Sequence, residues 1–87
     1  MKIIFTRTAE KHMKKIQQKK ALKKKVYELL DIIETDPFKT PPFYEKLIGD
    51  LEGAYSRRIN IQHRLVYEVD EEQQQVKILS LWSHYEY

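Results

Sequence analysis

The sequence predicts an α+β fold in which two N-terminal helices pack on one face of an antiparallel β-sheet. Apolar residues recur at helical spacing in the N-terminal half and alternate with polar residues in much of the C-terminal half. All three prolines fall in one segment, residues 35–47, which separates the two halves. Because the 87 residues contain no repeat and no long linker, we expect a single domain spanning residues 1–87.

The N-terminal half contains one strand and two helices. Residues 2–6 form a short apolar, β-branched run that is typical of a strand. A first helix is expected at about 8–18, with Thr8 as a plausible N-cap. The second helix, at about 20–34, is strongly amphipathic, and its lysines fall on the outer face. The residue before Pro37 is biased away from helical geometry, so this helix is expected to end there.

The C-terminal half predicts a small sheet. A short extended piece at 45–48 is followed by a glycine-containing turn at 49–53, and strands are expected at 55–60, 64–69 and 76–82. The connections between these strands are too short for crossovers, so the strands should form an antiparallel meander. If the helices cover one face of the sheet, the other face remains open for a site.

The charge is distributed unevenly. Up to Tyr27 the chain has ten lysines and arginines against Glu10 alone, although the net charge of the whole chain is only +3. A polyanion, or an acidic segment of a protein partner, would be attracted to this half. We therefore consider Lys23 and Lys24 as candidate RNA contacts, while a solvated helical face explains the same lysines equally well.

Three arginines lie in the stretch "SRRINIQHRLVYEVD". Strand alternation places Arg57 on the side of Tyr55, and Arg58 on the opposite side. Arg64 faces away from Leu65 and should point to the open face. A planar guanidinium suits a phosphate group, whereas the plain alternative is a set of arginines exposed to solvent.

A carboxylate, a guanidinium and an imidazole could together cleave RNA without a metal. Glu45 would take the proton from a ribose 2′-OH, Arg64 would stabilise the negative charge at phosphorus, and His84 would protonate the leaving oxygen. The spacing permits this set and does not establish it, because a near-terminal histidine is commonly just exposed. The other histidines have weaker cases, since His12 is on a helix edge and His63 is in a turn.

Several other classes of site are not supported. The chain has no cysteine, the three histidines lack metal-ligand spacing, and a glycine-rich phosphate loop is missing. We therefore expect no metal and no cofactor. The N-terminus has only a three-residue apolar run, which predicts neither a signal peptide nor a membrane span, so the expected location is the cytoplasm.

Four stretches carry a family resemblance: "EKL" at 45–47, "LEGAYSRRIN" at 51–60, "HRLVYEVD" at 63–70 and "HY" at 84–85. With them the chain resembles the Txe/YoeB toxins of type II toxin–antitoxin systems, within the RelE-like mRNA interferase superfamily. The resemblance implies a RelE-like, microbial-RNase-like fold. It also implies an endoribonuclease that inhibits translation by cleaving mRNA, typically at the ribosomal A site.

The resemblance also implies roles for individual residues. Glu45 matches the general base, Arg64 the phosphate-stabilising cation, His84 the general acid, and Tyr85 an orienting or stacking residue. Arg58 matches an auxiliary phosphate contact.

The loop before the glutamate departs from the family pattern. It reads "KTPPFYE" where many members have "GxGKPE". Members often have a lysine three positions after the glutamate, where this chain has Ile48, and Lys46 is a candidate substitute.

The expected partners follow from the same resemblance. They are a cognate antitoxin with an acidic, partly disordered tail, mRNA with the ribosome, and operator DNA only as part of the antitoxin complex. The resemblance also allows a homodimer and gives no membrane partner. Two alternatives stay open: a non-catalytic poison of the same fold, like the ParE gyrase inhibitors, and a plain RNA-binding or ribosome-binding module.

Overall fold

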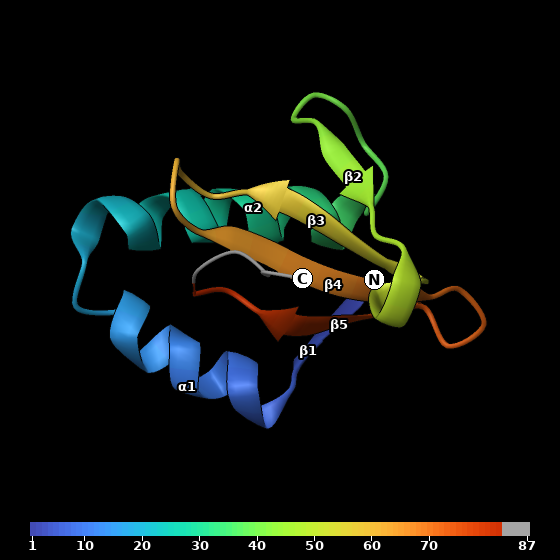
Figure 1. Cartoon of the computed structure of the whole chain (residues 1–87), viewed down its shortest axis with the longest axis horizontal. Helices are drawn as coiled ribbons and strands as arrows, with labels where there is room; N and C mark the ends of the chain where they lie inside the picture. The colour runs from blue at the N-terminus through green and yellow to red at the C-terminus, as the bar shows by residue number, and fades with distance from the viewer. Residues whose placement is uncertain (83–87) are drawn as a thin grey trace.

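The computed structural model describes residues 1–82, and its elements follow the predicted order (Figure 1). They are β1 (Lys2–Phe5), α1 (Arg7–Ile16), α2 (Lys20–Thr35), β2 (Tyr44–Lys46), the 3₁₀ turn η1 (Gly49–Leu51), β3 (Ala54–Arg58), β4 (Arg64–Asp70) and β5 (Gln75–Ser80).

The five strands form one sheet in the order β1-β5-β4-β3-β2. The run from β2 to β5 is antiparallel, which confirms the predicted meander. The expectation of a wholly antiparallel sheet needs one correction, because β1 pairs with β5 in parallel, with Ile3 opposite Val76. A parallel pair requires a long connection, and here the two helices and the other three strands lie between the paired strands in the chain.

The core lies between the helices and one face of the sheet. Figure 1 shows α2 running behind the strands and α1 lying along the β5 side. The helices contribute apolar residues such as Val26 and Leu29, and the sheet contributes Leu65, Tyr67 and Ile78, all at most 1% exposed. The amphipathic pattern thus directs the apolar face of α2 onto the sheet, as predicted, and leaves the opposite face of the sheet for a site.

The start of α1 differs slightly from the prediction. The N-cap is Thr6 and not Thr8, because the Thr6 hydroxyl accepts a hydrogen bond from the Ala9 N–H at 3.1 Å. The same hydroxyl donates to the Leu79 carbonyl at 3.1 Å, so the helix start is also tied to β5. This second contact comes from tertiary structure, and the local sequence therefore could not distinguish the two threonines.

In the part of the chain that the structure describes, neither helix combines the length and the apolar character needed to cross a membrane.

Candidate active site

Three neighbouring strands place polar side chains together on the face opposite the helices. Glu45 in β2 is paired with Ser56 in β3, and Arg58 in β3 is paired with Arg64 in β4. Since side chains alternate along a strand, Ser56 and Arg58 lie on the same face. The register therefore brings Glu45 and two arginines together although they are up to 19 positions apart in the chain.

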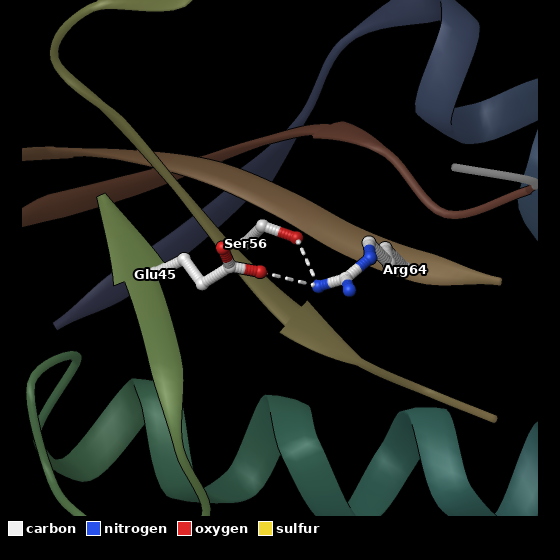
Figure 2. Close-up of polar contacts among 3 residues, drawn as sticks. All are labelled: Glu45, Ser56 and Arg64. Atoms are coloured by element: carbon white, nitrogen blue, oxygen red, sulfur yellow. Dashed lines mark hydrogen bonds and ion pairs between the residues drawn. The ribbon is translucent and has the colours of Figure 1, made fainter. Parts of the chain in front are cut away.

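The carboxylate and one guanidinium are in direct contact. Nη1 of Arg64 donates to Oε1 of Glu45 at 2.9 Å and lies 3.4 Å from the Ser56 hydroxyl oxygen (Figure 2). The Arg64 side chain is 29% exposed and that of Glu45 is 47% exposed, so both groups remain accessible from solvent. Figure 2 shows the two side chains reaching toward each other across β3.

A pocket of about 380 Å³ opens at this contact, and its lining residues are Pro42, Phe43, Glu45, Ser56, Arg58 and Arg64. Two like charges directly opposite each other on paired strands normally destabilise a sheet. Within residues 1–82 only Arg64 of this pair has an acidic partner. Such an arrangement is chemically suited to an anion with several oxygens, because a phosphate can accept hydrogen bonds from both guanidinium groups.

Arg57 has a different environment, although it precedes Arg58 directly. It is on the helix-covered face, on the side of the strand opposite to Arg58 as strand alternation predicts, and it is fully buried. Its guanidinium donates four hydrogen bonds, and all the acceptors are neutral oxygens: the carbonyls of Pro37 (3.0 Å), Lys39 (2.9 Å) and Pro42 (2.7 Å) and the hydroxyl of Tyr67 (3.0 Å). Arg57 is therefore not among the residues that line the pocket.

The contacts of Arg57 fix the proline-rich segment that leads into β2. The Tyr67 hydroxyl reinforces them by donating to the Pro37 carbonyl at 2.7 Å, and burial raises the pKa of Tyr67, so this hydroxyl keeps its proton. The ring of Tyr44 lies 5.1 Å from the Arg57 guanidinium carbon. Because Glu45 is the next residue, these contacts on the buried face determine where its carboxylate lies on the open face.

His12 performs a similar task at the end of β5. Its Nδ1 accepts hydrogen bonds from the backbone N–H groups of Leu81 (3.0 Å) and Trp82 (3.2 Å). Burial lowers the pKa of His12, and the nearby Lys15 and His63 lower it further, so the ring is neutral and Nδ1 is free to accept. His12 thus fixes the chain just before the segment that contains His84.

His63 is buried and stacks on Trp82, with 4.5 Å between the ring centroids.

The structure brings together some of the predicted site residues and separates others. Glu45, Arg58 and Arg64 meet in the pocket. Lys46 follows Glu45 in β2 and points to the opposite side of the strand, and Lys23 and Lys24 are on α2, on the helix-covered face of the sheet. The remaining two, His84 and Tyr85, lie outside the described residues.

Sequence reasoning missed Pro42, Phe43 and Ser56 as lining residues of the pocket. Ser56 could have been found, because it alternates with Arg58 in "SRR". Among residues 1–82 there is no group of three or more histidine, aspartate or glutamate side chains that could hold a metal ion.

Solved structures identify the class of protein to which this fold belongs. A YoeB/ParE toxin from Agrobacterium tumefaciens superposes with a TM-score of 0.91 at 29% identity, covering 98% of this chain and 100% of that one. A YoeB–YefM toxin–antitoxin complex from Staphylococcus aureus contains a chain that matches with a TM-score of 0.84 at 41% identity, covering 98% of both chains. The fold is that of a small bacterial toxin.

The family follows from the sequence comparison. The model of the YoeB-like toxins of bacterial type II toxin–antitoxin systems matches residues 5–85. A curated relative from Synechocystis sp., named Toxin YoeB, is 38% identical over 87 residues and is covered over 99% of its length, as is this chain. The chain belongs to the YoeB-like toxin family, which confirms the resemblance drawn from its sequence stretches.

Proposed function

We propose that this toxin is a metal-independent endoribonuclease that cleaves mRNA at the ribosomal A site and so inhibits translation. The observation that carries the proposal is the pocket in which a carboxylate, Glu45, lies 2.9 Å from the guanidinium of Arg64, with Arg58 on the neighbouring strand. These are the groups needed to remove a proton from a hydroxyl and to stabilise charge at phosphorus.

The reaction is an internal displacement at phosphorus. Glu45 accepts the proton of the ribose 2′-OH, and the 2′-oxygen forms a bond to the adjacent phosphorus. Arg64 and Arg58 stabilise the negative charge that builds up on the phosphorane oxygens. The bond to the 5′-oxygen breaks as His84 donates a proton to it, with Tyr85 orienting the substrate. The products are a 2′,3′-cyclic phosphate and a 5′-hydroxyl.

The contact between Glu45 and Arg64 explains how the base becomes available. Both side chains are partly exposed, and an ion pair of this kind contributes about 0–1 kcal/mol. A phosphate that accepts two hydrogen bonds from Arg64 replaces this weak pair with a stronger one. Substrate binding then releases the carboxylate to accept the proton of the 2′-OH.

The histidine that completes the set comes from the C-terminal segment. Ser80, the last residue of β5 and four positions before His84 in the sequence, is opposite Val66 in β4, close to Arg64 in the same strand. Trp82, the last described residue, packs on His63, which directly precedes Arg64 in the chain, and two residues of chain span at most about 7 Å. An imidazole at position 84 is therefore within reach of the strand that carries Arg64.

The basic residues of the chain suit the proposed partners, which are negatively charged. The related S. aureus toxin was solved in complex with its antitoxin, and we propose that a cognate antitoxin with an acidic tail neutralises this protein too. Ribosomal RNA would contact the lysines of the helices, including Lys23 and Lys24. The proposed location of this contact is the cytoplasm. In this proposal only the complex with the antitoxin binds operator DNA. Residues 1–87 act as one domain. Formation of a homodimer is compatible with both statements.

The proposal is tested by cleavage of mRNA on programmed ribosomes. We expect Glu45→Gln to lower the rate about 100- to 10,000-fold, because the amide cannot accept the proton. The matched control is Glu52→Gln, an exposed glutamate outside the pocket, which should cleave at the wild-type rate. A 2′-deoxy substitution at the mapped cleavage site should abolish the reaction.

The outcomes separate the proposal from its alternatives. A wild-type rate with Glu45→Gln, or cleavage of the 2′-deoxy substrate, would contradict the mechanism. Inhibition of a topoisomerase without RNA cleavage would instead identify a gyrase poison. Salt-sensitive ribosome binding without products would identify a binding module.

A further inference from the structure

Phe43 is an exposed aromatic residue at the edge of the candidate active site. The residue is 75% exposed, although phenylalanine is among the residues most often buried in proteins. It lines the same pocket as Glu45, Arg58 and Arg64. The chain thus presents a bare aromatic ring beside a carboxylate and two guanidinium groups.

The backbone fixes the direction of this ring. Tyr44, the first residue of β2, faces the buried side, where it contacts Arg57 and lies 5.7 Å from the ring centroid of Tyr55. Since neighbours in an extended chain alternate, Phe43 and Glu45 both face the pocket. The preceding carbonyl, that of Pro42, accepts a hydrogen bond from Arg57 at 2.7 Å. Phe43 is therefore held in place and is not at the tip of a loose loop.

We infer that Phe43 is a stacking platform for the base of the nucleotide whose 2′-OH attacks, the nucleotide on the 5′ side of the cleaved bond. This inference rests on the proposed function. If Glu45 contacts the 2′-oxygen and Arg64 contacts the phosphate, the base of the same nucleotide projects beyond the carboxylate. The pocket residue next to Glu45 on that face is Phe43, two positions away along an extended segment.

Stacking would give the enzyme a substrate preference that its charged residues cannot give. Arginine contacts to phosphate are independent of sequence, whereas stacking on an aromatic ring grows with the size of the base. We therefore expect a purine at this position to be preferred over a pyrimidine.

The test measures how cleavage depends on this one base. After the cleavage site of the wild-type toxin has been mapped on programmed ribosomes, the nucleotide 5′ of the cut is replaced by adenosine, uridine or an abasic ribose. For the wild type, kcat/KM should fall in that order, by about tenfold from adenosine to the abasic substrate. For Phe43→Ala the three substrates should be cleaved equally slowly, and Phe43→Tyr should restore the wild-type order.

The control variant is Ile48→Ala, which truncates another exposed apolar residue near β2, 80% exposed and outside the pocket, and should retain the wild-type rates. If the wild type does not cleave RNA, the proposed function fails and this inference fails with it. If the wild type cleaves and Phe43→Ala keeps the same dependence on the base, the stacking inference alone is overturned. A variant that keeps this dependence and loses only affinity for the antitoxin would overturn it as well, and would assign Phe43 to the protein interface.

Discussion

Arg57 and Arg64 are seven positions apart in the chain and lie on opposite faces of the same sheet. Arg57 is fully buried and donates only to neutral oxygens, three of them backbone carbonyls. Arg64 is partly exposed, and its charge is paired with a carboxylate in an open pocket. Each nitrogen of the first guanidinium is hydrogen-bonded within the protein, whereas the second forms a partly exposed ion pair of a kind that contributes about 0–1 kcal/mol.

The difference shows that burial and the type of acceptor, more than residue type, separate an arginine that holds the fold from one that is open to a ligand. Carbonyl oxygens from one proline-rich segment accept the hydrogen bonds of Arg57. These bonds therefore contribute to the stability of the folded protein. The open face carries Arg58 opposite Arg64, an arrangement of like charges that normally destabilises a sheet. The two faces are nevertheless connected, because the segment that Arg57 holds leads directly into Glu45.

The largest effect should come from removing the buried guanidinium. We expect Arg57→Met to lower the free energy of unfolding by about 4 kcal/mol, because several hydrogen bonds to a charged donor are lost and buried carbonyls lose their partners. The measurement is urea denaturation followed by circular dichroism. The neighbouring variant Arg58→Met is the control and should change stability by no more than about 0.5 kcal/mol. Equal losses in the two variants would remove the distinction between the faces.

The second effect concerns Arg64 on the open face, where we expect a loss of cleavage with little change in stability. Arg64→Met should lower the cleavage rate about 100-fold, because a preorganised donor to the phosphorane is lost. Its free energy of unfolding should change by less than about 1 kcal/mol, since the ion pair with Glu45 is partly exposed. Cleavage on ribosomes and urea denaturation are measured on the same preparation. A large loss of stability with unchanged cleavage would place Arg64 in the structural class beside Arg57.

Most of the fold could be predicted from local patterns. The apolar spacing of α2 and the alternation in β4 indicated both the elements and their buried sides, because each pattern reports burial directly. The parallel pairing of β1 with β5 could not be predicted in the same way. It joins residues more than 70 positions apart, and no short-range signal in the sequence specifies a contact of that separation.

Residues of the candidate site could be predicted only where a family pattern or strand alternation indicated them. Alternation placed Arg64 on the open face, and the resemblance singled out Glu45. The role of Arg57 was missed, because its partners are carbonyl groups of residues 37–42, and every residue type has a carbonyl. His12 was missed for a related reason, since it binds two backbone N–H groups some 70 positions away.

The smallest effect concerns pH and tests a third kind of residue, a neutral side chain that holds the backbone. The pKa of His12 is lowered mainly by burial and also by Lys15 and His63, so the folded protein binds a proton there less readily than the unfolded chain does. Its stabilising contribution is therefore complete above the unfolded pKa of about 6.5 and is lost as the pH falls through the folded pKa. Protonation of Nδ1 would remove the acceptor that holds Leu81 and Trp82.

The variant His12→Asn isolates the pH-dependent contribution of His12 to stability. The asparagine oxygen can replace Nδ1 as an acceptor, but it does not bind a proton between pH 5 and 8. We expect the urea midpoint of the wild type to fall more steeply than that of His12→Asn between pH 7.5 and pH 5.5, because only the wild type carries at position 12 a group that binds a proton more readily in the unfolded chain than in the folded protein. Parallel midpoints across this range would mean that the hydrogen bonds of His12 do not depend on its protonation. In that case the end of β5 would be held in place by packing of Leu81, which is fully buried, and not by the imidazole.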